Sequence, residues 1–296
     1  MEYQWNKTTT KTETLQAFLK AEGISSRTLK KIRQGQGKIF WNNQLVKGNL
    51  KVNKLGTVGL QMIPEHVDPS VFQSKLPINI IMEDDYFVVI NKSPNLSSVP
   101  GPNDQQNTLA NRVLGYAQRQ QHPYVPHILT RLDFDTSGLV LFAKSNFIQS
   151  MLQEQISNHT LKKIYYALVS GYLTQQHAMI DLPLEKESFE SARRVVRESG
   201  KFAQTEYWVE QEFADATLVK VQLHTGRTHQ IRAHFAALNH PLVGDQLYGG
   251  PTKLIQRQML HAYQLELINP FTKQKQKFVA PLANDFQKVI EMLKQN

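Results

Sequence analysis

The sequence predicts an α+β fold with a mixed, largely antiparallel sheet, preceded by a small α+β domain of its own. The chain has 296 residues, 41% apolar and 20% charged, which is enough for about two domains with hydrophobic cores. Segments of strand character alternate irregularly with segments of helical character, and this order is not that of a repeating βαβ unit. Excess positive charge is confined to the first 64 residues, which indicates a separately organised N-terminal module.

Two short helices followed by short strands are expected in residues 14–62. Apolar residues recur at helical spacing in two stretches: Leu15, Phe18 and Leu19, then Leu29 and Ile32. The break at residues 23–26 contains Ser25 and Ser26, either of which can cap the second helix. Strands are expected at residues 38–41, 44–46 and 57–62.

Basic residues dominate this N-terminal module. Residues 1–64 contain eleven Lys and Arg against three Asp and Glu, and so carry +8 of the chain's net charge of +9. Such a concentration favours a polyanionic partner, although a merely soluble basic surface is an equally good interpretation of charge alone. The element order resembles the S-four-type RNA-binding module, whose second helix and following turn lie against RNA. The resemblance implies RNA contacts for Arg27, Lys30 and Lys31.

The larger domain is expected to follow a short linker. We assign residues 1–64 to the basic module, 65–76 to the linker and 77–296 to the larger domain. Strands are expected at 78–82, 86–90, 138–143, 164–169, 203–209, 218–223 and 278–280. Helices are expected at 108–119, 146–156, 228–238 and 286–293.

Composition also restricts the chemistry and the location of the protein. The chain contains no cysteine, which excludes disulfides, thiolate nucleophiles and cysteine-ligated metal centres. It lacks an apolar run of the roughly 20 residues that span a bilayer, and its first residues do not resemble a secretory signal. We therefore expect a cytoplasmic protein without a membrane partner, and a monomer.

A polar turn opening into an apolar strand is the strongest local signal for catalysis. Residues 129–144 read LTRLDFDTSGLVLFAK, with Asp133 two residues after Arg131. Catalytic groups are commonly placed on loops at strand ends, and a nearby arginine would keep an aspartate ionised as nucleophile or base. In isolation, the alternative that these residues only complete a turn is equally favoured.

A second cluster of polar residues lies at residues 223–235. Thr228 is the expected N-cap of a helix, with Arg227 just before it and Arg232 at the border of its apolar stripe. Such arginines suit a phosphate or a partner carboxylate. The histidines at 224, 229 and 234 are five residues apart and cannot share one helix face, so no metal site is expected.

Taken together, these segments resemble the RluA/RluD-type family of RNA pseudouridine synthases. The signature segment is matched by Arg131-Leu132-Asp133, Thr136-Ser137-Gly138 and Phe142-Ala143-Lys144. Further blocks follow in the family's order over residues 78–282: 89–92, 163–169, 225–232, 240–245 and 260–262.

The resemblance implies isomerisation of uridine to pseudouridine in RNA, on a pseudouridine synthase-like fold and without a metal or cofactor. It implies catalytic roles for Asp133, for Arg232 as its ion-pair partner, and for Tyr165, which stacks on the uracil. Asp133 either attacks C1′ or removes a proton from C2′. The resemblance also implies substrate or RNA contacts for further residues: Arg131, Thr136, Lys163, Arg227 and His229.

Two departures from the family pattern and three alternatives accompany this hypothesis. Thr130 stands where the family usually has His, and Ser93 precedes Pro94 where the family usually has Lys-Pro. The expected substrate is ribosomal RNA, with transfer RNA as the alternative. A catalytically inactive RNA-binding protein is a less favoured alternative. Residues 133–136 also fit the nucleophile loop of aspartyl-phosphate phosphatases, but Arg131 interrupts the strand that such enzymes need before the first Asp.

Overall fold

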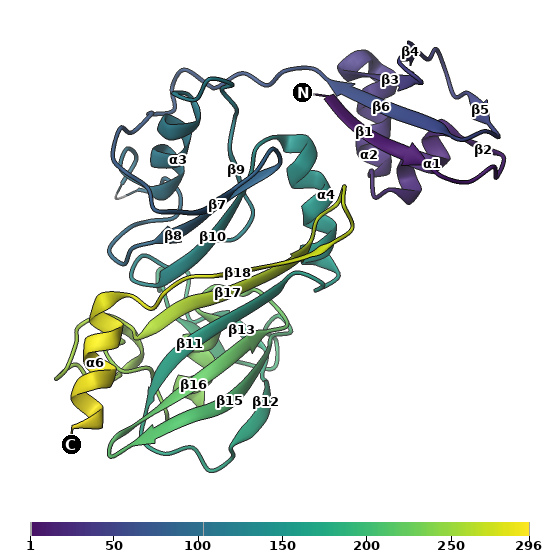
Figure 1. The fold of residues 1–296 in the computed structure, drawn as a ribbon. Helices are drawn as coiled ribbons and strands as arrows, with labels where there is room; N and C mark the ends of the chain where they lie inside the picture. Colours follow the sequence, from purple (N-terminus) through teal and green to yellow (C-terminus); the bar gives the residue numbers. More distant parts are fainter. Residues whose placement is uncertain (1, 103, 296) are drawn as a thin grey trace.

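The computed structural model describes residues 2–102 and 104–295, and its strands form a small N-terminal sheet and a ten-stranded sheet (Figure 1). The small sheet has the order β1-β6-β3-β4, with all its pairs antiparallel. The N-terminal elements, in chain order, are β1 (Glu2–Lys7), β2 (Glu13–Thr14), α1 (Leu15–Ala21), α2 (Ser26–Lys31), η1 (Ile32–Gln36), β3 (Gly37–Trp41), β4 (Gln44–Leu45), β5 (Lys51–Val52) and β6 (Gly56–Met62). Strands β2 and β5 pair with each other as a separate two-stranded sheet.

The two predicted helices of the N-terminal module are confirmed, and the strands β1, β2 and β5 were missed. The Ser25 hydroxyl caps α2 by accepting a hydrogen bond from the backbone N–H of Thr28 at 3.1 Å. Strand β1 was not expected from the sequence, yet it pairs with β6 along its whole length. Its alternation buries Tyr3 and Trp5, which is the period-two pattern of a half-buried strand.

The large sheet is mixed and largely antiparallel, as predicted. Its order is β12-β15-β16-β11-β17-β10-β8-β7, with β18 beside β17 and β9 beside β10. Among the described residues, only β10 and β17 pair in parallel. The strands are β7 (Ile80–Glu83), β8 (Phe87–Lys92), β9 (His127–Ile128), β10 (Ser137–Ala143), β11 (Lys162–Ser170), β12 (His177–Asp181), β15 (Gln204–Phe213), β16 (Ala216–Leu223), β17 (Leu260–Ile268) and β18 (Lys275–Val279). A separate hairpin is formed by β13 (Leu184–Lys186) and β14 (Arg194–Val196). Strand β17 was missed because polar residues such as His261 and Gln264 interrupt its apolar pattern.

Helices cover both faces of the large sheet, and all four expected helices are present. They are α3 (Leu109–Ala117), α4 (Asn146–Ser157), α5 (Gln230–Ala237) and α6 (Asn284–Lys294). Alternate residues of β10 belong to different cores, with Leu141 facing the core that contains α4 and Phe142 facing the core that contains α3 and α5. The chemistry-bearing segments 129–137 and 225–232 therefore meet on the α5 side.

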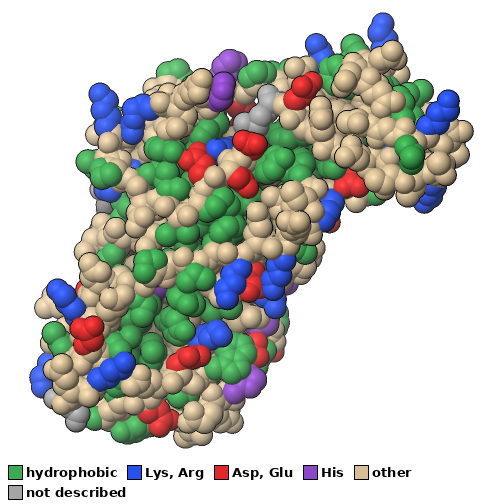
Figure 2. All heavy atoms as spheres, in the orientation of Figure 1, with side chains coloured by type: hydrophobic (Ala, Val, Ile, Leu, Met, Phe, Trp, Pro, Cys, Tyr) green, Lys and Arg blue, Asp and Glu red, His purple; other side chains and the backbone are tan. Residues whose placement is uncertain are grey.

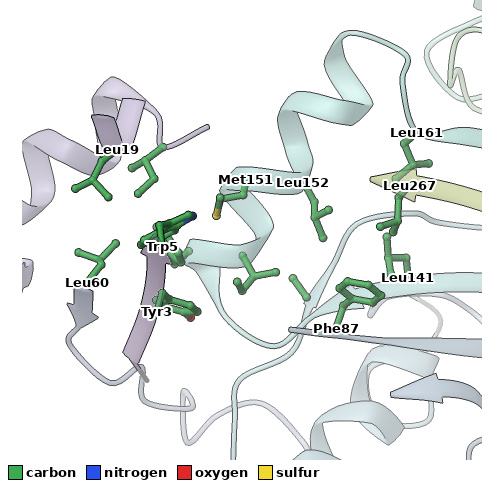
Figure 3. Close-up of a cluster of buried hydrophobic side chains, with 14 of the residues drawn as sticks. Tyr3, Trp5, Leu19, Leu60, Phe87, Leu141, Met151, Leu152, Leu161 and Leu267 are labelled. Atoms are coloured by element: carbon green, nitrogen blue, oxygen red, sulfur yellow. The ribbon is translucent and has the colours of Figure 1, made fainter. Parts of the chain in front are cut away.

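The N-terminal module packs against α4 and the β17–β18 turn, and its buried residues share a hydrophobic core with the larger domain (Figure 3). The Tyr3 ring lies 4.4 Å from Phe147 of α4 and its hydroxyl lies 2.9 Å from the Ser145 hydroxyl. Trp5 and Phe271, which lies in the β17–β18 turn, have ring centroids 5.5 Å apart. This aromatic contact holds the module in one place beside α4.

Acid should destabilise the fold through His261, a fully buried residue of β17 whose Nδ1 lies 2.9 Å from the Ser137 hydroxyl. Burial lowers the pKa of His261 to about 4. Between that pH and the unfolded value of about 6.5, the unfolded chain binds a proton that the folded chain does not. Stability should fall as pH falls through this window, by about 3 kcal/mol from this group alone.

Urea unfolding of the wild type and of His261→Asn across pH 4–7 measures this contribution. The Asn amide can keep the bond to Ser137 but cannot titrate, so the variant should lose less stability toward acid. Equal pH dependence of the two proteins would show that His261 does not drive the acid response.

Candidate active site

A cavity of about 760 Å³ lies where the loop before β10 meets β11, the turn after β16 and the start of α5. Its lining includes four basic side chains but a single acid: Arg131, Lys163, Arg227 and Arg232, with Asp133. The volume is in the range of pockets that bind small molecules or single nucleotides. The charge of the lining suits an anionic substrate.

The loop that carries Asp133 is fixed from several distant parts of the chain. Ser98 donates its hydroxyl to the Leu132 carbonyl at 2.6 Å and accepts from the Leu132 N–H at 3.0 Å. The Lys92 ammonium donates to the Phe134 carbonyl at 2.9 Å, and Arg257 donates to the Asp135 carbonyl at 3.0 Å. These bonds pre-organise the position of the Asp133 carboxylate, whose side chain is 24% exposed.

Lys92 is a fully buried lysine beneath this loop. Besides the Phe134 carbonyl, its ammonium donates to the carbonyls of Ser93 and Leu96 at 2.9 and 2.8 Å. Burial lowers the pKa of Lys92 to about 7, although Asp135 and Asp133 oppose that shift. Lys92 therefore links the end of β8 to the loop that carries Asp133, through backbone carbonyls.

Arg232 of α5 connects two carboxylates inside the protein. Its Nη1 donates to Asp133 Oδ2 at 3.1 Å, while Nε and Nη2 donate to the two oxygens of Asp245 at 2.6 and 2.9 Å. Asp245 is 1% exposed. Burial would lower the pKa of Arg232, but Asp245 and Asp133 outweigh that effect and raise it. The guanidinium is permanently charged, is held by Asp245 through two bonds, and donates its third bond to Asp133.

Tyr248 and His229 enclose the other side of Arg232. The Arg232 guanidinium carbon lies 5.1 Å from the centroid of the Tyr248 ring, a cation–π distance. His229 Nδ1 lies 3.3 Å from the Tyr248 hydroxyl and its Nε2 lies 3.8 Å from Asp133 Oδ2. Burial lowers the pKa of His229, an effect that Asp133 opposes and Arg232 reinforces.

The expectation that Thr228 caps α5 was wrong. Helix α5 begins at Gln230, and its N-cap is His229, in the left-handed conformation with φ 56° and without a side-chain capping bond. The exposed Thr228 lies in the turn before the cap. Gln230 stabilises this turn instead, because its side-chain oxygen accepts from the Arg227 N–H at 2.9 Å and from the Thr225 hydroxyl at 2.7 Å. The left-handed cap turns His229 toward Asp133.

Tyr165 and Lys163 lie on the same face of β11, and both line the cavity. Tyr165 is 7% exposed. Burial raises its pKa and Asp133 adds to this effect, so the phenol keeps its proton at neutral pH. Burial lowers the pKa of Lys163.

Three other predicted contact residues line the cavity: Arg131 and Arg227 are exposed, whereas Thr136 is buried. Arg227 donates from Nε to the Phe202 carbonyl at 3.0 Å. Thr136 is 1% exposed and its hydroxyl accepts a 3.3 Å bond from Gln258, a position that suits support of the loop. Thr130 stands at the position where the family usually has His. Its hydroxyl accepts a 2.9 Å bond from the backbone N–H of Leu141 in β10 and so satisfies that buried donor.

The predicted RNA contacts of the N-terminal module lie on its surface. Arg27 and Lys30 of α2 are exposed, while Lys31 is half-buried near Glu65, whose pKa it helps to lower. In the space-filling view, Lys and Arg side chains project from the outer edge of the module (Figure 2). The basic side chains are therefore accessible to a polyanion.

Comparison with known proteins identifies the family. Residues 86–237, which contain Asp133, Tyr165 and Arg232, match the family described as RNA pseudouridylate synthase. The chain belongs to the RNA pseudouridylate synthase family. It is an isomerase that converts uridine in RNA to pseudouridine. The alternative of an aspartyl-phosphate phosphatase was therefore wrong.

Relatives and solved structures extend the match beyond that segment. The chain is 36% identical to the uncharacterized RNA pseudouridine synthase YjbO of Bacillus subtilis, over 91% of this chain and 95% of YjbO. It is 35% identical to ribosomal large subunit pseudouridine synthase D of Nitrosomonas europaea, over 77% and 68% of the two chains. The human RNA pseudouridylate synthase domain containing 4 has the same fold, with a TM-score of 0.61 and 22% identity over 73% of this chain and 93% of that one.

Sequence reasoning missed the residues that hold the site together. Asp245 was noted only as part of a matching block, and the network roles of Ser98, Arg257 and Tyr248 were not predicted. Asp245 carried one usable signal, because an aspartate directly after Gly244 in an apolar segment is typical of a buried ion pair. Within the described part of the chain, no group of three His, Asp or Glu side chains could hold a metal ion.

Proposed function

We propose that this enzyme isomerises uridine in ribosomal RNA, with Asp133 as the catalytic carboxylate, Arg232 as its ion-pair partner and Tyr165 as the stacking residue. The observation that carries this proposal is the contact of Arg232 with Asp133 at the cavity, while Asp245 holds the same guanidinium from behind. Ribosomal RNA is favoured because relatives such as the Nitrosomonas enzyme are named for the large ribosomal subunit.

We propose a separate task for each of these residues. Arg232 bonds to Oδ2 of Asp133, and this leaves Oδ1 to act on the ribose, either by attack on C1′ or by removal of a C2′ proton. The N1–C1′ bond breaks, the uracil turns beside Tyr165, and C1′ bonds to C5, whose proton is lost while N1 gains one. The neutral Tyr165 phenol and the aliphatic walls of the cavity suit an uncharged nucleobase such as uracil.

Access to the uridine requires that it leave its base stack, which costs a few kcal/mol in a helix. Arg131 is exposed at the rim of the cavity, two residues before Asp133. We assign it to the RNA strand beside the extruded uridine, and Arg227 to the backbone nearby. His229, between Tyr248 and Asp133, completes the wall on the α5 side.

Mapping of pseudouridines in total RNA, with and without the gene, tests this function. We expect one or more sites in ribosomal RNA to disappear on deletion and to return with the wild-type gene, but not with Asp133→Asn. Sites lost only from transfer RNA would assign the enzyme to that substrate instead.

The N-terminal module, residues 1–64, is proposed to bind RNA through α2, with residues 65–76 as the linker and 77–296 as the catalytic domain. Deletion of the module is a poor test, because it would remove Tyr3 and Trp5 and so expose the rings of Phe147 and Phe271 that they cover. Charge substitutions on α2 avoid that damage, because they leave Tyr3 and Trp5 in place.

Replacement of Arg27, Lys30 and Lys31 by Gln should weaken RNA binding and reduce its salt dependence. If each contacts one phosphate, the slope of log affinity against log salt should fall in magnitude by about 2 to 3. The matched control replaces the exposed Lys47, Lys51 and Lys54 by Gln, with the same change in net charge. Equal slopes for the two triple variants would show that α2 has no special part in RNA binding.

We further propose a cytoplasmic monomer, and light scattering of the purified protein tests the oligomeric state. No helix among the described residues is long and apolar enough to cross a membrane.

A further inference from the structure

Lys163 is a basic residue of the cavity whose role the catalytic network does not explain. It lies on β11, paired with Leu223 of β16, and points to the side of the sheet on which Tyr165 lines the cavity. Its ammonium nitrogen would lie 3.1 Å from a Cβ atom added at Gly226, so it sits against the backbone of the turn before α5.

Of the other three basic residues in the cavity lining, Arg227 donates to the Phe202 carbonyl, Arg232 is held by carboxylates, and Arg131 is exposed at the rim. Arg232 is bonded to Asp245 and Asp133, and Asp133 is the single acid in the cavity lining. Among the described residues, Lys163 has no ion-pair or hydrogen-bond partner, and burial lowers its pKa. A half-buried ammonium without a counter-charge gains free energy from any anion that enters the cavity.

The position of Lys163 relative to Tyr165 indicates which anion this is. Residues two apart on a strand are separated by about 6.6 Å and project to the same side. This is comparable to the separation of a nucleobase from its own phosphate. If Tyr165 stacks on the uracil, the Lys163 ammonium is within reach of the backbone of the same nucleotide.

We propose that Lys163 binds a phosphate adjacent to the target uridine, so that the cavity recognises a nucleotide and not only a nucleobase. The proposal rests on the proposed function of the cavity as the uridine site. It gives Lys163 a binding role on the substrate backbone, separate from the bond-breaking role of Asp133 and from the electrostatic role of Arg232.

Binding of small probes tests the proposal without any turnover. Uridine, uridine 3′-monophosphate and uridine 5′-monophosphate are titrated into the full-length protein and followed by NMR. We expect one monophosphate to bind about tenfold more tightly than uridine, as for a charge-assisted hydrogen bond. Lys163→Met should remove this preference, and Lys163→Arg should keep most of it. The two monophosphates distinguish the 3′ from the 5′ phosphate.

The neighbouring Lys162 supplies a matched control, because it is an exposed lysine on the same strand and its side chain projects to the opposite face. Lys162→Met should keep the wild-type preference. The proposal is overturned if no monophosphate binds better than uridine, or if Lys163→Met and Lys162→Met behave alike.

Kinetics on ribosomal RNA separate this proposal from the proposed function. Lys163→Met should raise KM about tenfold with a smaller effect on kcat, since the lost contact is with the backbone and not with the reacting atoms. Inactive wild-type enzyme on all RNAs would refute the proposed function. Active wild-type enzyme with unchanged Lys163→Met kinetics would refute only the phosphate contact.

Discussion

Asp133→Asn should abolish pseudouridine formation while the protein stays folded and bound to RNA. The amide is nearly isosteric with the carboxylate but is neither a nucleophile nor a base, so the rate should fall at least about 10⁴-fold. The fold should persist because Asp133 is partly exposed and Arg232 keeps its two bonds to Asp245. A tritium-release or sequencing assay on ribosomal RNA measures the rate, and filter binding measures the affinity.

Asp135→Asn is the matched control in the same loop. Asp135 is held through its backbone carbonyl by Arg257, and that bond does not depend on the side chain. Burial raises the pKa of the Asp135 carboxyl, so the neutral amide is the milder change. Near-normal activity is expected. If Asp133→Asn kept wild-type activity, or if Asp135→Asn lost as much, the catalytic carboxylate would have been assigned to the wrong residue.

Local patterns were sufficient to predict the elements that carry the site. Asp133 and Arg232 were predicted from short motifs, because a polar loop before an apolar strand and a helix with an apolar stripe are features of neighbouring residues. The structure brings these two side chains to 3.1 Å although 99 positions separate them. The pairing itself came from the family resemblance, since no periodicity relates the two segments.

What could not be predicted depends on long-range packing. Asp245, the N-cap of the short 3₁₀ helix η2 (Gln246–Tyr248), bonds to Arg232, and Lys92 of β8 bonds to the loop that carries Asp133. The start of α5 depends on the left-handed backbone conformation of His229. The preference for Thr at N-cap positions favours Thr228 and cannot predict that His229 takes this place. Strand β1 was missed for a related reason, because its aromatic residues are buried by α4 and the β17–β18 turn, which lie far along the chain.

Asp245→Asn should lower both the activity and the stability of the protein, although Asp245 does not contact Asp133. The carboxylate makes the two shortest bonds to Arg232, and its loss leaves a buried guanidinium with one acidic partner. Breaking a buried ion pair in this way costs about 3–5 kcal/mol of stability. The rate should fall about 10²–10³-fold, since Arg232 is then free to move away from its contact with Asp133.

Asp285→Asn supplies a control with matched geometry. Asp285 binds Nε and Nη2 of Arg257 at 2.6 and 2.7 Å, the same bidentate arrangement that Asp245 makes with Arg232. The Asp285 side chain is 40% exposed, so its replacement should lower the stability less. Arg257 donates to the backbone carbonyl of Asp135 in the loop that carries Asp133, and not to the Asp133 carboxylate. Urea unfolding and the rate on ribosomal RNA are measured for both variants.

The two variants separate a positioning role from a general effect of instability. If Asp245 acts through Arg232, its replacement should lower kcat at temperatures where the variant is fully folded, and a temperature reduction should restore stability without restoring the rate. Asp285→Asn, compared at equal fraction folded, should keep a near-normal kcat. Equal losses of kcat in the two variants would mean that the Asp245 contact only stabilises the fold. A selective loss in Asp245→Asn would mean that the orientation of Arg232 determines how well Asp133 reacts.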